Sequence, residues 1–170
     1  YPPGEIVRLV SANGEVMGLA TFNPHSLIAA RRLTTEVDTT IDAAFWAARL
    51  RRALAIRERI YSEPCYRLIH SEADGFPGLV ADRYGDALVL QVNSAGIERA
   101  LPNLLEAVDE VLAAGIVVIR ADSRVRQLEK LHRYVRVARG QLDGLVEMEE
   151  NGVRALADLQ SGQKTGWYYD

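Results

Sequence analysis

The chain has 170 residues, of which 48% are hydrophobic and 25% are charged, and its formal net charge is -3. These values are ordinary for a soluble protein and suit one domain, or one and a half, with a real core. A single cysteine, Cys65, excludes an internal disulfide, no apolar run approaches the roughly 20 residues of a membrane-spanning helix, and the start has no signal-peptide pattern.

Three short strands are predicted at the N-terminus, over residues 5–10, 16–22 and 27–33. Asn13-Gly14 supplies the positive φ of a hairpin turn between the first two. Three strands alone leave open edges, so we expect them to be the last part of a small β-barrel that begins upstream. The first residues, Tyr-Pro-Pro-Gly, and the last, Trp-Tyr-Tyr-Asp, also favour a fragment, or the ordered part, of a longer protein.

A helix is predicted over residues 41–61, after a polar linker, with Thr40 as its N-cap. Trp46, Leu50, Ala53 and Leu54 recur at i, i+4, i+7 and i+8, which places them on one apolar stripe.

Residues 66–85 are organised as strand, polar loop, strand and turn, with the turn expected at residues 82–86. The stretch gathers His70, Glu72, Asp74, Asp82 and Arg83. Such a cluster suits a functional site, but these side chains can equally cap the loop by bonding its own backbone.

A βαβ unit is predicted next, from a strand at 87–92, a helix at 97–112 and an all-apolar strand at 116–119. The two strands are therefore expected to be parallel. Asn93 or Ser94 is the candidate helix cap, Pro102 suits the true first turn, and Gly115 is expected to close the helix.

Positive charge is concentrated in residues 120–139, which contain seven basic and two acidic residues. The net charge of this segment is therefore +5, and that of the rest of the chain is -8. A local basic face of this kind can hold RNA phosphates, although a solvated face with scattered ion pairs is an equal alternative. A short helix after Asp122-Ser123, a strand at 134–138 and a hairpin of residues 142–148 and 153–159 complete the predicted elements.

The C-terminal residues 162–170 are the strongest functional candidate. Two glycines bracket Gln163, Lys164 and Thr165, so the loop can bend sharply, and the aromatic residues that follow can stack on a base or an adenine. A domain linker with a tethering aromatic cluster is the alternative. Cys65 has no flanking pattern that would activate it, and the three histidines have no zinc-ligand spacing, so we predict neither a catalytic residue nor a metal site.

Three blocks of the sequence together resemble one family. They are Asn23-Pro24-His25-Ser26-Leu27-Ile28-Ala29-Ala30-Arg31, residues 66–85, and Gly162-Gln163-Lys164-Thr165-Gly166-Trp167-Tyr168-Tyr169-Asp170. The chain is similar in these blocks to ribosomal RNA methyltransferases that use S-adenosylmethionine, modify carbon-5 of cytosine in 23S rRNA and carry an N-terminal PUA domain. One segment departs from the family, which has Glu-Gly-Leu where this chain has Glu129-Lys130-Leu131.

The resemblance implies an α/β central domain with a βαβ unit and a hairpin, preceded by the C-terminal strands of a PUA-like β-barrel. We expect residues 1–36 to belong to the PUA-like part, 37–160 to the central domain, and 161–170 to the entry of a methyltransferase domain beyond Asp170, because the chain has no glycine-rich cofactor turn after a strand. The implied cofactor-binding residues are Gln163, Lys164, Thr165, Tyr168 and Asp170. The implied RNA-binding residues are Arg31, Arg32, Arg120, Arg124, Arg126 and Lys164.

The predicted function is the RNA-binding and cleft-forming portion of a cytoplasmic RNA methyltransferase, inactive alone. Its expected partners are RNA and S-adenosylmethionine, with a homodimer left open and no membrane or metal. Two alternatives stay open: a stand-alone RNA-binding or dimerisation module, and a methyltransferase acting on protein or a small molecule.

Overall fold

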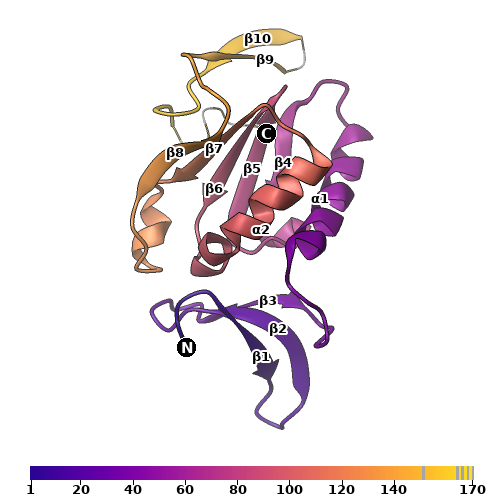
Figure 1. Cartoon of the computed structure of the whole chain (residues 1–170), viewed down its shortest axis with the longest axis vertical. Coiled ribbons are helices and arrows are strands. Elements are labelled where there is room, and N and C mark those ends of the chain that lie inside the picture. Colours follow the sequence, from indigo (N-terminus) through magenta and orange to yellow (C-terminus); the bar gives the residue numbers. More distant parts are fainter. Residues whose placement is uncertain (151, 164, 166, 168, 170) are drawn as a thin grey trace.

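The computed structural model describes residues 1–150, 152–163, 165, 167 and 169. Figure 1 shows a central five-stranded sheet with two helices, a small sheet beyond one end and a hairpin beyond the other. The predicted fold class is confirmed: a mixed α/β domain follows the strands of a smaller β sheet. No helix in the described part of the chain has the length and apolar character needed to span a membrane.

The small sheet contains β1 (Glu5–Val10), β2 (Val16–Phe22) and β3 (Ala30–Thr34), all antiparallel. The third strand begins later than predicted, because residues 23–29 form a compact turn. The Asn23 side chain accepts a hydrogen bond from the His25 N–H, and the Asn23 N–H donates to the Ala29 carbonyl. Leu27, expected inside the strand, is fully exposed at the tip of this turn.

The first helix, α1, spans Ala43–Glu58, and its N-cap is Asp42, whose carboxylate accepts a hydrogen bond from the Phe45 N–H at 2.9 Å. The prediction of Thr40 as the cap was therefore wrong by two residues. The predicted stripe is correct, since Trp46, Leu50 and Ala53 are buried against the central sheet.

The central sheet has the order β4 (Cys65–His70), β5 (Leu79–Tyr84), β6 (Ala87–Val92), β7 (Ile116–Ala121) and β8 (Tyr134–Arg139). Only β6 and β7 are parallel, as the βαβ unit predicted. The polar loop after β4 contains a short 3₁₀ helix, η1 (Ser71–Asp74). Asp82, expected in a turn, lies inside β5 and is fully buried, because it pairs with Arg67 on the neighbouring strand.

The second helix, α2, spans Ala95–Val111 and is capped by Ser94, one of the two predicted caps. Pro102 lies well inside the helix, so the prediction that it marks the first turn was wrong. The left-handed position after the helix is taken by Ala113, at φ 47°, and not by Gly115. The Ala113 N–H still bonds back to the Val108 carbonyl, which closes the helix end without a glycine.

A 3₁₀ helix, η2 (Arg124–Gln127), follows β7, and Lys130 just after it has φ 53°. The family that the sequence resembles has glycine at this position. Lys130 therefore adopts a left-handed conformation that glycine adopts more easily. The predicted hairpin is confirmed as β9 (Val146–Glu150) paired antiparallel with β10 (Val153–Ala157).

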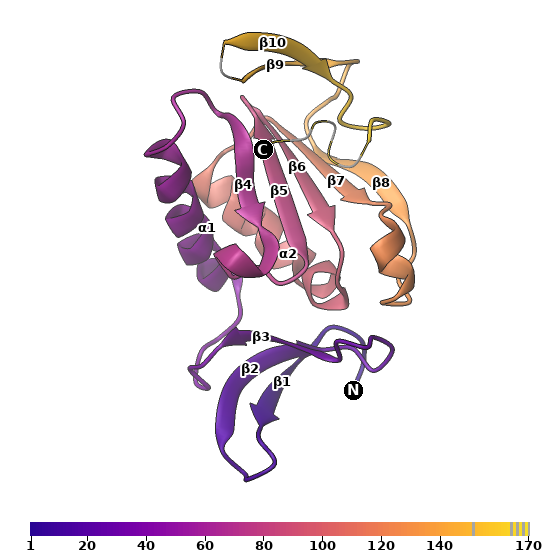
Figure 2. The same cartoon turned by 180° about the vertical axis from the view of Figure 1, so that it is seen from behind.

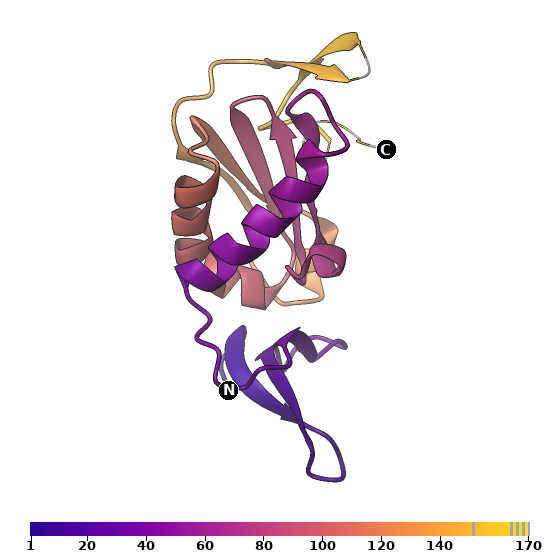
Figure 3. The same ribbon diagram turned by 90° about the vertical axis from the view of Figure 1, so that its right-hand side faces the viewer.

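The two faces of the central sheet are covered differently. Both helices lie on one face of the sheet (Figure 3). The main core on this face includes Leu68, Leu90 and Ile119 of the strands and Trp46 and Leu104 of the helices. On the other face, the hairpin covers only one end of the sheet (Figure 2). Val89 and Val118 form a second, smaller core there with Met148, Ala157 and Leu159. The remaining part of that second face is open, and it carries the site described below.

The small sheet is docked tightly to the central domain through Glu129. This carboxylate is 3% exposed and accepts hydrogen bonds from Asn23 Nδ2 at 2.7 Å, the Ala95 N–H at 3.2 Å and Arg31 Nη2 at 3.3 Å. We call Glu129 together with these bonded partners, Asn23, Arg31 and Ala95, the Glu129 joint.

Close packing adds to this joint at the start of α2. Gly96 lies so near Thr21 of β2 that an added Cβ would sit 2.5 Å from the threonine side chain. A larger residue at position 96 would therefore push the small sheet away from α2.

Candidate nucleic-acid interface

An open cleft of about 780 Å³ lies on the helix-free face of the central sheet. Its floor follows from strand alternation: Val80, Gln91 and Arg120 are register partners on β5, β6 and β7, so all three point to the same face. The 122–133 region forms one wall and residues 161–163 form another. The described lining residues are Arg67, Val80, Gln91, Asn93, Arg120, Asp122, Ser123, Arg124, Val125, Arg133, Ser161, Gly162 and Gln163.

Arg120, predicted to bind RNA, lines this cleft but is committed to internal contacts. Its side chain is 4% exposed. It bonds Asp122 through two nitrogens, at 2.8 and 3.2 Å, and donates to the carbonyls of Leu159 and Gly162 at 3.3 and 2.8 Å. Burial pushes the pKa of Asp122 up, but the hydrogen bond and charge of Arg120 outweigh it and the pKa is lowered. Arg120 therefore anchors the 159–162 turn to β7.

Arg126 is 1% exposed, and its guanidinium is occupied within the protein. It pairs with Glu98 at 2.8 Å, donates to the Val92 carbonyl at 2.9 Å and donates twice to the His132 carbonyl at 2.9 and 2.6 Å. A side chain so enclosed presents no surface to a phosphate. We therefore leave Arg126 out of the proposed RNA contacts, and its place is structural.

Arg31 and Arg32 lie on β3, outside the lining of the cleft. Arg31 pairs with Glu72 at 3.2 Å and with Glu129 at 3.3 Å, so it belongs to the Glu129 joint. Arg32 is exposed and lines a separate hollow with Arg49 and Arg52. The structure thus does not bring these two arginines together with those of the basic region.

Arg124 and Arg133 carry the unbalanced positive charge at the cleft. Both are exposed, and in the described part of the chain neither forms an ion pair; Arg133 donates only to the Asp122 carbonyl, at 2.6 Å. The other two arginines in the lining, Arg67 and Arg120, are each paired with an aspartate. Of the predicted RNA contacts, Arg124 is the one whose charge faces solvent at this site.

Three residues of the cleft, Arg67, Gln91 and Arg133, were not predicted as site residues. Arg67 alternates with Tyr66 and Leu68 in β4, which are buried on the helix side. The same alternation puts Gln91 between the buried Leu90 and Val92. A polar residue inside an otherwise apolar strand was therefore the available signal.

Residues 162–169 contribute through two of the predicted cofactor residues. Gln163 lines the cleft. Thr165 is fully buried and donates to Asp82 Oδ2 at 2.5 Å, while the Tyr84 hydroxyl donates to the Thr165 carbonyl at 3.3 Å. Asp82 therefore holds both the Arg67 guanidinium, at 2.8 and 3.1 Å, and the C-terminal segment. Lys164, Tyr168 and Asp170 lie outside the described residues.

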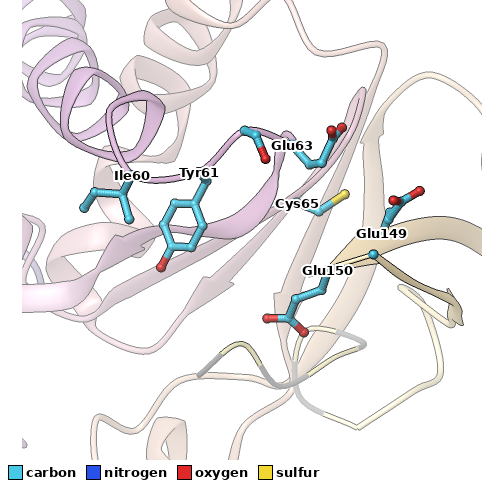
Figure 4. A pocket seen from close by; sticks show the side chains of 8 residues that line it. Ile60, Tyr61, Glu63, Cys65, Glu149 and Glu150 are labelled. Atoms are coloured by element: carbon cyan, nitrogen blue, oxygen red, sulfur yellow. The ribbon is translucent and has the colours of Figure 1, made fainter.

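A second hollow, of about 470 Å³, lies between the end of α1 and the β9–β10 hairpin (Figure 4). Its labelled side chains include Cys65 together with Glu63, Glu149 and Glu150. Three carboxylates repel phosphate, so the hollow does not suit RNA. Within the described residues, no group of side chains has the composition of a metal site.

Comparison with known protein families adds a match at the N-terminus. Residues 1–35 match the family described as PUA-like domain, which covers the β1–β3 sheet.

Curated relatives match almost the whole chain, among them two proteins named Ribosomal RNA large subunit methyltransferase I. The protein from Alteromonas mediterranea is 35% identical over 170 residues, and that from Cronobacter sakazakii is 36% identical over 176 residues. The matches cover 98% and 99% of this chain but only 43% of each relative, so the chain spans less than half their length.

Solved structures share the fold. A SAM-dependent methyltransferase structure from Streptococcus mutans superposes with a TM-score of 0.82 at 17% identity, over 99% of this chain and 44% of that one. The methyltransferase SMU.776, solved in complex with SAH, gives 0.81 at 17% identity, over 98% of this chain and 43% of that one. By sequence the chain is similar over almost its whole length to part of the ribosomal RNA large subunit methyltransferases I, and it opens with a PUA-like segment.

Proposed function

We propose that this chain is the RNA-binding and cleft-forming portion of an S-adenosylmethionine-dependent RNA methyltransferase in the cytoplasm, with carbon-5 of a 23S rRNA cytosine as the acceptor. The observation that carries the proposal is the open cleft, where Arg124 and Arg133 face solvent without ion pairs in the described part of the chain. The names of the curated relatives support the same substrate class. We further propose the division into residues 1–36, 37–160 and 161–170.

Phosphate binding follows from charge. RNA phosphates release bound counterions when arginines neutralise them, so affinity falls as salt rises, with a slope of about -0.7 per contact for a single strand. Two contacts, from Arg124 and Arg133, predict about a sevenfold loss of affinity between 50 and 200 mM salt. Arg67 and Arg120 add little, because Asp82 and Asp122 already balance them.

This chain contributes to cofactor binding only indirectly. S-adenosylmethionine supplies the methyl group, and we propose that Gln163, Lys164, Thr165, Tyr168 and Asp170 border it. The described residues of this set fit a supporting place: Gln163 faces the cleft, and the Thr165 hydroxyl is already bonded to Asp82. Asp82 therefore holds Thr165 in place.

Methyl transfer to cytosine carbon-5 needs a thiolate that attacks the ring, and Cys65 is the one cysteine of the sequence. Cys65 lines the second hollow and not the cleft, so we propose that the chain alone is inactive. Arg124 and Arg133 place the RNA, and the chemistry belongs to other residues.

The test uses fluorescence anisotropy of a labelled 23S rRNA fragment at 50, 100 and 200 mM salt. We expect the affinity to fall with salt, and the double variant Arg124→Ala/Arg133→Ala to bind more weakly with a shallower slope. Arg154→Ala, an 84% exposed arginine on the hairpin, serves as the matched control and should bind like the wild type. Binding that ignores salt would contradict the phosphate contacts, and methyl transfer from labelled S-adenosylmethionine by this chain alone would contradict the proposed inactivity.

A further inference from the structure

The floor of the cleft carries a polar group that the fold itself does not use. Gln91 lies near the C-terminal end of β6, between Val80 of β5 and Arg120 of β7, and is half-buried. Its side-chain amide has no hydrogen-bond partner in the part of the chain that the structure describes. Because the amide lies at the base of an open cleft and the described residues leave its donor and its acceptor unused, it can bond to a ligand in that cleft.

Resting on the RNA-binding function proposed above, we propose that this cleft takes one unpaired ribonucleotide, with its base edge on Gln91 and its phosphates on Arg124 and Arg133. The Gln91 amide offers a donor and an acceptor together, the pair of groups that a base edge presents. Asn93 lies beside it and uses its Oδ1 to accept from Ser123 Oγ at 2.5 Å. The same bond fixes the amide so that its NH₂ is left to donate.

Arg67 forms the side of this pocket. Its Nε and Nη2 donate to the two carboxylate oxygens of Asp82, which holds the guanidinium plane in one orientation. The Arg67 side chain keeps 28% exposure. A fixed guanidinium plane is a stacking surface for an unpaired base, so Asp82 acts here as a positioning residue.

The size and shape of the cleft favour an unpaired nucleotide over a duplex. Its volume of about 780 Å³ lies in the usual range of small-molecule pockets, about 300–1,000 Å³. In an RNA duplex the major groove is too deep and narrow for side chains to read, and proteins recognise the shallow minor groove mostly by its shape and by 2′-OH and phosphate contacts. A duplex would meet the arginines at the rim, whereas an unstacked base can reach Gln91 on the floor.

The experiment compares labelled single-stranded 12-mers of rA, rC, rG and rU with a duplex of mixed sequence, by anisotropy at 100 mM salt. For the wild type we expect single strands to bind more tightly than the duplex, with one base preferred by about tenfold. Gln91→Ala should reduce that preference to less than threefold and leave the salt dependence unchanged. Gln91→Met, which keeps the volume of the side chain, should do the same and guards against a folding defect in the alanine variant.

The outcomes separate this inference from the function on which it rests. If the wild type binds with a salt dependence but Gln91→Ala and Gln91→Met keep its base preference, the nucleotide pocket is wrong and the RNA-binding function stands. Equal binding of duplex and single strands would overturn the pocket in the same way. If no RNA binds in a salt-dependent way, the function itself fails.

Discussion

Replacing Glu129 by glutamine tests how the small sheet is held to the central domain. The variant keeps the shape of the side chain but removes its charge and turns one oxygen into an NH₂ group. If the amide oxygen takes the place of Oε2, the bonds from Asn23 Nδ2 and the Ala95 N–H survive as neutral bonds. The NH₂ group then faces Arg31 Nη2, so two donors meet where a charge pair stood.

The expected cost can be worked from these contacts. Hydrogen bonds to a charged group are worth about 1.5–3 kcal/mol and neutral ones about 1 kcal/mol. Loss of the charge from the two retained bonds and loss of the Arg31 pair therefore amount to about 2–3 kcal/mol. Arg31 keeps its ion pair with Glu72, so the cost should stay near or below the lower end of the range of about 3–5 kcal/mol for breaking a buried ion pair. For a chain of this size the melting temperature should fall by about 5–10 °C.

Urea denaturation followed by circular dichroism measures the effect. Glu110→Gln is the matched control, because Glu110 makes an exposed ion pair with Arg51. Such pairs contribute about 0–1 kcal/mol, so the control should melt like the wild type. If Glu129→Gln loses no more stability than Glu110→Gln, the buried carboxylate does not hold the joint and the reasoning is refuted.

The pH dependence gives a second check of the same carboxylate. Burial alone would raise the pKa of Glu129, but hydrogen bonds from Asn23, Ser26, Ala95 and Arg31 outweigh it and lower the pKa from its ordinary value of 4.5. A lowered pKa means that the stabilisation is complete above pH 4.5 and is lost as the pH falls through the folded-state value. The stability gap between wild type and Glu129→Gln should therefore be constant from pH 5 to 7 and shrink below about pH 4.

Three further substitutions test other parts of the fold. Asp82→Asn should lower the free energy of unfolding in urea by about 2–4 kcal/mol, because it leaves the Arg67 charge unpaired and weakens the bond from Thr165. The control Asp109→Asn removes a carboxylate from a largely exposed ion pair and should cost less than about 1 kcal/mol. Gly96→Ala should destabilise the fold by about 1–3 kcal/mol, since the new Cβ would lie 2.5 Å from the Thr21 side chain. In a helix without such a contact alanine is more stable than glycine, so a gain of stability would contradict the close contact. Lys130→Gly should raise stability by up to about 1 kcal/mol, because it removes a side chain from a left-handed position, and a loss would show that the lysine side chain contributes more than its backbone strain costs.

Much of the fold could be predicted because its signals are local. The stripe of Trp46, Leu50 and Ala53, the βαβ pattern and the Asn13-Gly14 hairpin each depend on residues close in sequence, and these elements formed where expected. Element ends were less predictable. Thr40 and Asp42 are both good cap residues, and in the structure it is Asp42 that accepts the bond from the Phe45 N–H. Gly115 is a residue type that often ends a helix, but the left-handed position after α2 is taken by Ala113, two residues earlier.

The candidate site shows the limit more sharply. Arg120, Arg124 and Arg126 are near neighbours of one type, and the sequence assigns them one role. The tertiary structure separates them: Arg126 is enclosed by Glu98 and the His132 carbonyl, Arg120 anchors a turn far along the chain, and Arg124 faces solvent.

The sequence by itself determined the order of the elements, the α/β class and the concentration of positive charge, because periodicity, turn chemistry and composition are properties of short stretches. Only the tertiary structure decided which arginines keep a free charge and that Gln91 lies at the base of the cleft. The physical reason is that the electrostatic role of a side chain depends on the groups packed around it, and here those groups come from strands and turns up to 106 positions away, as in the bond between Asn23 and Glu129.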